Sequence, residues 1–202
     1  MSVKIIIIIL LVVVAVLIVG LVANKFKQKI NISDDVKIDT SMFEAKSIDE
    51  IWEIEEKENF VVEMDKYIAE KCEYGDNMET LNGEQKVFYI TQSLEMEVNN
   101  GGFAQFFFNS SGMFGNELVS SFEKIGAMKT AEICKKAISI YGDKVPADRD
   151  EREEILTTDD ETEEERIEAI LNECDDAFFE YEDDLVELNY QFIINHKESF
   201  LK

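Results

Sequence analysis

The chain has 202 residues, of which 46% are hydrophobic and 32% charged, with 44 acidic residues against 20 basic ones. A chain of this length can bury a full core in one domain. Its net charge of −24 repels nucleic acid and anionic lipid, so direct binding to nucleic acid is excluded as an expected function.

A transmembrane helix is predicted at residues 5–23, a run of nineteen residues without a charge. At about 1.5 Å of rise per residue, this run spans roughly 30 Å of hydrocarbon. A cleavable signal peptide is the alternative, but the run exceeds the usual apolar core, and Leu21 stands where a small residue is expected. Residues 1–4 form a short flank before the span.

The orientation of the span follows from its flanking charges. Three lysines lie at residues 25–29, against Lys4 before the span, so the positive-inside rule places the C-terminal part in the cytoplasm. Three cysteines without CxxC spacing suit buried thiols in a reducing compartment; they are Cys72, Cys134 and Cys174. We therefore expect a single-pass protein of the cell membrane with a cytoplasmic C-terminal domain.

The remaining chain divides into a polar juxtamembrane linker at residues 24–47 and an acidic domain at residues 48–202. Apolar residues of this domain recur with helical spacing. The clearest stripe comprises Ile167, Ile170, Leu171, Cys174, Phe178 and Tyr181. The expected fold class is all-α, an acidic multi-helix bundle preceded by the single transmembrane helix.

Helix boundaries are marked by polar caps and by glycine. Asn82 and Gln85 have the spacing of a capping box, and Asn116 can cap a later helix. Gly142 fits the left-handed position that follows a helix end. The run KVFYIT at residues 86–91 has the composition of a strand, but its flanks favour a helix.

The sequence NNGGFAQFFFNSSG at residues 99–112 departs from ordinary amphipathic helix. Gly101 and Gly102 are expected to end the preceding helix, because glycine reaches positive φ without a Cβ penalty. The spacing of Phe103, Phe106 and Phe107 predicts three rings on one buried face of a helical turn. The candidate residues of this corner are Asn99, Asn100, Gly101, Gly102, Phe103, Gln105, Phe106, Asn109, Ser110 and Gly112.

Two roles for the corner remain open. Short polar side chains that bond to backbone within a tight corner would be structural. If Gln105, Asn109 and Ser110 instead line a pocket with Glu95 or Glu97, they would contact a small ligand or a partner.

The motif EVNNGGFAQFFFNSSG at residues 97–112, with the acidic sequence LNECDDAFFEYEDDLVELNYQFI at 171–193, resembles the bacterial DNA-mimic-protein family. The likeness runs from about Trp52 to Phe200. It implies an acidic, helical and dimeric domain that occupies the DNA-binding face of a transcription regulator, here with an added N-terminal membrane anchor.

Acidic residues concentrate at residues 148–187, where 20 acids stand against three arginines. In a helix, this net charge of −17 gives one negative charge per ~3.5 Å, close to the spacing of about 3.4 Å along one DNA strand. The predicted partner-binding residues are Asp175, Asp176, Glu180, Asp183, Asp184 and Glu187. Four of them form a stripe at i, i+4, i+7 and i+11: Asp176, Glu180, Asp183 and Glu187. A merely solvated face is the alternative.

Catalysis is not expected. The single histidine, His196, lies near the C-terminus and is expected to face solvent, and no nucleotide-binding, hydrolase or zinc-protease pattern occurs. Paired carboxylates at residues 159–160 and 175–176 could hold a divalent cation, but they lack the pattern of an EF-hand or a di-iron bundle. Neither a metal nor another cofactor is predicted.

The sequence therefore predicts a membrane-anchored acidic interaction module that binds a basic protein surface, with mimicry of DNA charge as one way of doing so. Its expected partner is a basic protein such as a DNA-binding regulator. A membrane-tethered immunity or inhibitor protein, which binds a basic toxin, is one alternative. The other is a small-ligand or metal-dependent enzyme that uses the corner at residues 99–112.

Overall fold

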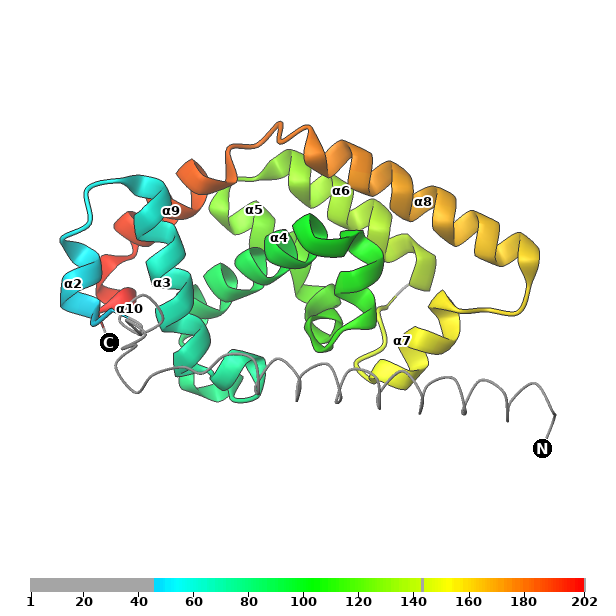
Figure 1. The fold of residues 1–202 in the computed structure, drawn as a ribbon, viewed down its shortest axis with the longest axis horizontal. Coiled ribbons are helices and arrows are strands. Elements are labelled where there is room, and N and C mark those ends of the chain that lie inside the picture. The colour runs from blue at the N-terminus through cyan, green and yellow to red at the C-terminus, as the bar shows by residue number, and fades with distance from the viewer. Residues whose placement is uncertain (1–45, 143, 202) are drawn as a thin grey trace, which may run out of the picture. The chain divides into compact units, whose positions relative to one another are not determined.

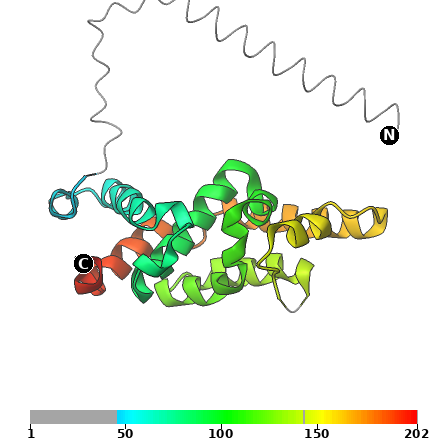
Figure 2. The ribbon, with the colours of Figure 1, turned by 90° about the horizontal axis from the view of Figure 1, so that it is seen from below.

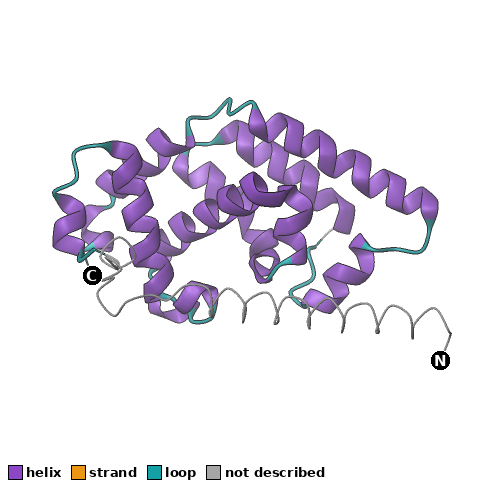
Figure 3. Ribbon diagram, viewed as in Figure 1, coloured by secondary structure: helices purple, strands orange, loops and turns teal. Residues whose placement is uncertain are grey.

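A computed structural model describes residues 46–142 and 144–201 as one helical domain (Figure 1). The predicted flank, the predicted span at residues 5–23 and the predicted linker up to residue 45 lie outside the described residues. Within the described ranges, no helix is both long enough and apolar enough to cross a membrane. The same ranges contain helices and loops but no strand, which confirms the all-α fold class for this part of the chain (Figure 3).

Nine α-helices make up the described part of the chain. They are α2 (Ile48–Trp52), α3 (Lys57–Lys71), α4 (Gly83–Phe108), α5 (Leu118–Ile125), α6 (Met128–Ile138), α7 (Arg149–Leu156), α8 (Glu161–Phe179), α9 (Leu185–Asn195) and α10 (Lys197–Phe200). Short 3-10 helices lie between some of them: η2 (Glu73–Gly75), η3 (Met78–Thr80), η4 (Ser110–Glu117) and η5 (Ser139–Tyr141).

Helix α4 forms the centre of the domain. It packs against α3, α5, α7, α8 and η4, and the second view keeps it between α3 on one side and α7 and α8 on the other (Figure 2). The predicted capping box is confirmed, since the Gln85 N–H donates to Asn82 Oδ1 at 3.0 Å and the Asn82 N–H donates to Gln85 Oε1. The run at residues 86–91 is helical, as its flanks predicted.

The glycine pair breaks α4 but does not end it. Gly102 has φ 76° and ψ 179°, after which the chain resumes a helix to Phe108. The break frees the Phe103 N–H, which donates to Asp175 Oδ1 on α8 at 2.7 Å. The predicted stop of the first helical segment at the glycines is confirmed, since both residues leave the helical conformation, and a carboxylate from another helix caps the second helical segment that follows.

Asn116 does not cap α5. Its amide Nδ2 donates to Val145 O at 2.8 Å, and the Val145 N–H donates to Asn116 Oδ1 at 3.0 Å. The side chain thus holds the loop before α7 against η4, and the predicted cap was wrong because this longer-range pairing uses the same atoms. Gly142 has the predicted positive φ, at 75°.

Replacing Gly102 with alanine is expected to lower the free energy of unfolding by about 3 kcal/mol, as measured by urea denaturation. Its φ and ψ values lie in a region that only glycine populates readily, and an added Cβ would overlap the Asp175 carboxylate. Gly83→Ala in the same helix is the control, since its Cβ meets no atom within 4 Å and its expected effect is below about 1 kcal/mol. Equal effects of the two substitutions would contradict this account of the break.

Candidate functional site: the corner of α4 and the acidic face of α8

The corner at residues 99–112 is organised around the Glu97 carboxylate. Gln105 Nε2 donates to Glu97 Oε2 at 2.6 Å, Asn109 Nδ2 donates to the same oxygen at 2.9 Å, and Ser111 Oγ donates to Oε1 at 2.9 Å. Glu97 precedes the glycine break and its three donors follow it, so these bonds tie the two segments of the corner together. The polar side chains therefore bond within the corner, but chiefly to the Glu97 carboxylate and not to backbone, so the arrangement matches neither of the two predicted alternatives.

The other corner residues divide into buried and exposed groups. Phe103, Phe106 and Phe107 are fully buried, which confirms the prediction for the three rings. Asn99 Nδ2 donates to Tyr181 Oη at 2.7 Å and so holds the loop after α8. Asn100, Gly101 and Ser110 are exposed, and the side chains of Asn100 and Ser110 form no hydrogen bond within the described part of the chain.

Arg152 on α7 completes the corner and was not identified from the sequence. Its side chain is almost fully buried, and its Nε and Nη2 donate to the carbonyl oxygens of Phe107 and Asn109, both at 2.8 Å. Gly112 leaves room for this contact, since a Cβ there would lie 2.6 Å from Arg152 Nε. Burial lowers the pKa of Arg152. Its guanidinium donates hydrogen bonds to carbonyl oxygens at the C-terminal end of α4, where a positive charge is favourable.

The acidic stripe predicted between residues 176 and 187 does not lie on one helix. Helix α8 ends before the loop at residues 180–184. Two acids of this loop cap neighbouring helices. Asp183 Oδ2 accepts the Thr130 N–H of α6 at 2.8 Å, and Asp184 Oδ1 accepts the Glu187 N–H of α9 at 2.9 Å. The continuous stripe was thus wrong, because acids with helical spacing in the sequence instead satisfy helix N-termini.

The remaining predicted partner-binding residues have different environments. Glu187 pairs with Lys57 at 2.6 Å, and Asp175 caps the break in α4. Burial raises the pKa of Asp175, and the nearby carboxylate of Asp176 acts in the same direction. The hydrogen bond from the Phe103 N–H acts in the opposite direction and lowers this pKa. Asp176 and Glu180 are exposed, and their carboxylates have no hydrogen bond or ion pair to any other described residue.

A different acidic stripe runs along α8 and ends at Glu180, the residue that caps the C-terminal end of this helix. Its residues fall on one helical face, are exposed, and have no side-chain partner among the residues that the structure describes. We call it the α8 stripe: Glu161, Glu165, Glu168, Asp176 and Glu180. Two other acids of α8 are engaged in ion pairs, Glu163 with Arg166 and Glu173 with Lys136.

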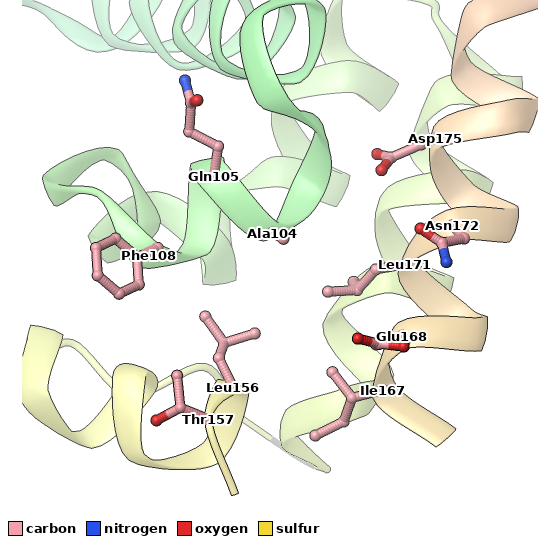
Figure 4. Close-up of a pocket in the computed structure, with 10 residues that line it drawn as sticks. All are labelled: Ala104, Gln105, Phe108, Leu156, Thr157, Ile167, Glu168, Leu171, Asn172 and Asp175. Atoms are coloured by element: carbon pink, nitrogen blue, oxygen red, sulfur yellow. The ribbon is translucent and has the colours of Figure 1, made fainter. Parts of the chain in front are cut away.

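A pocket of about 500 Å³ opens beside the α8 stripe (Figure 4). Its walls come from the second segment of α4, the end of α7, and the side of α8 that carries Glu168 and Asp175. Gln105 lines it, but neither Glu95 nor Glu97 does. It is therefore not the pocket that the sequence suggested, which would be lined by Glu95 or Glu97.

His196, considered as a catalytic base, and Asp160, considered as a metal ligand, both have structural contacts. His196 ends α9, with Nδ1 2.8 Å from Phe192 O, and Asp160 caps α8 through the Thr162 N–H at 3.0 Å. The three cysteines are buried and unpaired, as predicted. No group of three or more His, Cys, Asp or Glu side chains among the described residues is arranged to hold a metal ion.

Residues 79–196 match the family model described as DMP19-like protein. The chain belongs to this family. The matched range includes the α4 corner and the α8 stripe of the DMP19-like domain, but not α2 or α3. No curated protein and no solved structure matches the chain.

Two carboxylates of the DMP19-like chain, those of Asp65 on α3 and Glu95 on α4, are partly removed from solvent. Burial, together with the nearby negative charge of Glu95, raises the pKa of Asp65 to about 6, although Lys66 acts in the opposite direction. Burial also raises the pKa of Glu95, although that carboxylate accepts hydrogen bonds from Tyr181 Oη at 3.2 Å and Gln92 Nε2 at 3.1 Å. Because burial disfavours the charged form of a carboxyl group, ionisation of these two groups lowers the free energy of unfolding.

Asp65→Asn is expected to stabilise the protein at pH 7, by up to about 3 kcal/mol. Since the pKa of Asp65 is about 6 in the folded state and 3.8 as its ordinary value, the folded state binds more protons between these pH values. Wild-type stability therefore falls as the pH rises from about 4 to 6, and the advantage of the variant disappears below about pH 4. Urea denaturation at several pH values measures it, and a pH-independent difference would contradict the assignment.

Proposed function

We propose that the chain is a membrane-anchored acidic interaction module that binds a basic protein surface through the α8 stripe. Membership of the DMP19-like family and a net charge of −24 support an acidic module. The observation that carries the proposal is the set of exposed carboxylates on one face of α8 that have no partner among the described residues. The anchor is the apolar run at residues 5–23, and its flanking lysines favour a cytoplasmic domain.

The geometry of the stripe suits arginine and lysine side chains. From Glu161 to Phe179 the helix rises by roughly 27 Å, so the carboxylates form a line of acceptors on a rigid support. Arginine binds carboxylates and phosphates in the same bidentate manner. A protein surface that binds DNA phosphates is therefore a suitable partner, and DNA mimicry is the form of the proposal that we favour.

The proposal assigns no catalytic role to the corner at residues 99–112. The Glu97 carboxylate already accepts hydrogen bonds from the side chains of Gln105, Asn109 and Ser111. Asn99 donates to the Tyr181 hydroxyl. An immunity protein would use the same stripe against a basic toxin, so the test must separate a DNA-binding partner from a toxin.

Capture of a partner by the full chain in mild detergent tests the stripe. The stripe variant is E165Q, E168Q, D176N and E180Q. The control removes four exposed acids that lie on other helices and loops and whose side chains have no partner in the described ranges: E55Q, E70Q, E79Q and E123Q. Both variants remove four charges, so any difference between them reports position and not net charge.

A basic protein should bind to the wild type and to the control, and its retention on the stripe variant should fall at least tenfold. Salt should release it steeply, because the contacts are exposed ion pairs. Duplex DNA should compete if the partner is a DNA-binding regulator, and it should not compete if the partner is a toxin without a DNA site. Equal retention by the two variants would overturn the proposal.

A further inference from the structure

The pocket between α4, α7 and α8 has an apolar floor and an acidic wall. Phe108, Leu156, Ile167 and Leu171 provide the floor (Figure 4). Its volume of about 500 Å³ lies in the range of pockets that hold small molecules or single side chains. The floor favours an apolar group, because burying such a group removes its surface from water.

The charged residues among those that line the pocket are both acids, Glu168 and Asp175. One arginine that contacts a lining residue of the pocket is already engaged: Arg149 Cζ lies 4.9 Å from the centre of the Phe108 ring, and its Nε donates to Phe108 O at 2.9 Å. Glu168 is exposed and has no partner within the described part of the chain. An organic cation with an apolar stem thus meets favourable contacts at both of its ends.

Continuity with the α8 stripe indicates where such a cation comes from. Glu168 belongs to both the pocket and the stripe, and Asn172, which also lines the pocket, lies on the same face of α8 between Glu168 and Asp176. A basic segment that lies along the stripe would pass the mouth of the pocket. One of its long side chains could enter while its neighbours pair with the exposed carboxylates.

We propose that the pocket receives an arginine or lysine side chain, with an adjacent apolar residue, from a basic segment of the protein partner. This inference rests on the proposed function of the α8 stripe. The aliphatic stem lies on Leu156, Ile167 and Leu171, and the cationic group pairs with Glu168 and with the oxygen of Asp175 that does not accept the Phe103 N–H. The glycine break in α4 has a role here, because the chain changes direction at the break and the segment that follows places Ala104 and Phe108 in the wall of the pocket that faces α8.

Binding of a small peptide tests the pocket. The probe is the acetylated tripeptide amide Leu-Arg-Leu, compared with Leu-citrulline-Leu, which has nearly the same shape without the charge. Saturation-transfer NMR with the full chain in zwitterionic nanodiscs measures the affinity, and empty discs provide the background. The arginine peptide should bind with saturation, at least fivefold more tightly than the citrulline peptide.

Two matched substitutions locate the binding site. Ala104→Leu fills the pocket from its α4 wall, whereas Ala169→Leu places the same side chain on an exposed part of α8 that does not line the pocket. Ala104→Leu should weaken the arginine peptide at least tenfold and Ala169→Leu less than twofold. Glu168→Gln adds no volume, and it should weaken the arginine peptide but not the citrulline peptide.

Three results would overturn the pocket assignment: no saturable binding, equal affinity for the two peptides, or equal effects of the two alanine substitutions. The proposed function is judged separately by the capture experiment. If the stripe variant loses the partner while the tripeptide fails to bind, the stripe stands and the pocket assignment falls. If the stripe variant keeps the partner, the proposed function falls whatever the tripeptide does.

Discussion

The break in α4 at Gly101 and Gly102 is the constraint on which the rest of the domain depends. The chain changes direction there, and the backbone at the break has an N–H without a helical partner. Asp175 accepts that N–H from α8, and the Glu97 carboxylate holds the segments together from the other side. Three buried phenylalanines, the position of Arg152 and one wall of the pocket follow from the resulting direction of the chain.

The acidic residues of this protein divide into two groups with different consequences. Some carboxylates satisfy helix N-termini, as Asp183 and Asp184 do, or organise the corner, as Glu97 does. Each of these is committed to the fold and cannot leave its site without a loss of stability. Those of the α8 stripe are exposed and make no such contact in the described residues, so their mutual repulsion is relieved only by salt or by a basic partner.

Local sequence predicted much of the fold but only part of the site. Helical periodicity, the Asn82 capping box and the three phenylalanines depend on neighbours within a few residues, and the structure confirms them. The roles of Asp175, Asp183 and Asn116 depend on residues that are 29 to 72 positions away, and spacing along the chain carries no signal for such contacts. The sequence did place Glu97 beside Gln105 and Asn109, but as part of a pocket, whereas the structure shows it as their hydrogen-bond acceptor within the corner.

The same limit explains the displaced acidic surface. A spacing of i, i+4, i+7 and i+11 assigned Asp176 and Glu187 to one helix, although the chain leaves the helix at residues 180–184. Tyr181 has φ 46° there, and its hydroxyl contacts Glu95 and Asn99 on α4. Tertiary contacts of this loop override the helical periodicity, so the usable stripe extends toward the start of α8 instead.

The unfolding free energy of Glu97→Gln tests the central claim, that the polar residues of the corner hold the break in α4. Glutamine has nearly the same shape as glutamate, but its NH₂ group is a hydrogen-bond donor. This donor would face the donors of Gln105, Asn109 and Ser111, so hydrogen bonds to the former carboxylate would be lost. The account predicts a loss of about 2 kcal/mol in urea denaturation, against less than about 0.5 kcal/mol for Glu123→Gln, an exposed acid on α5. Equal stability of the two variants would contradict the account and would return the corner to the list of candidate ligand sites.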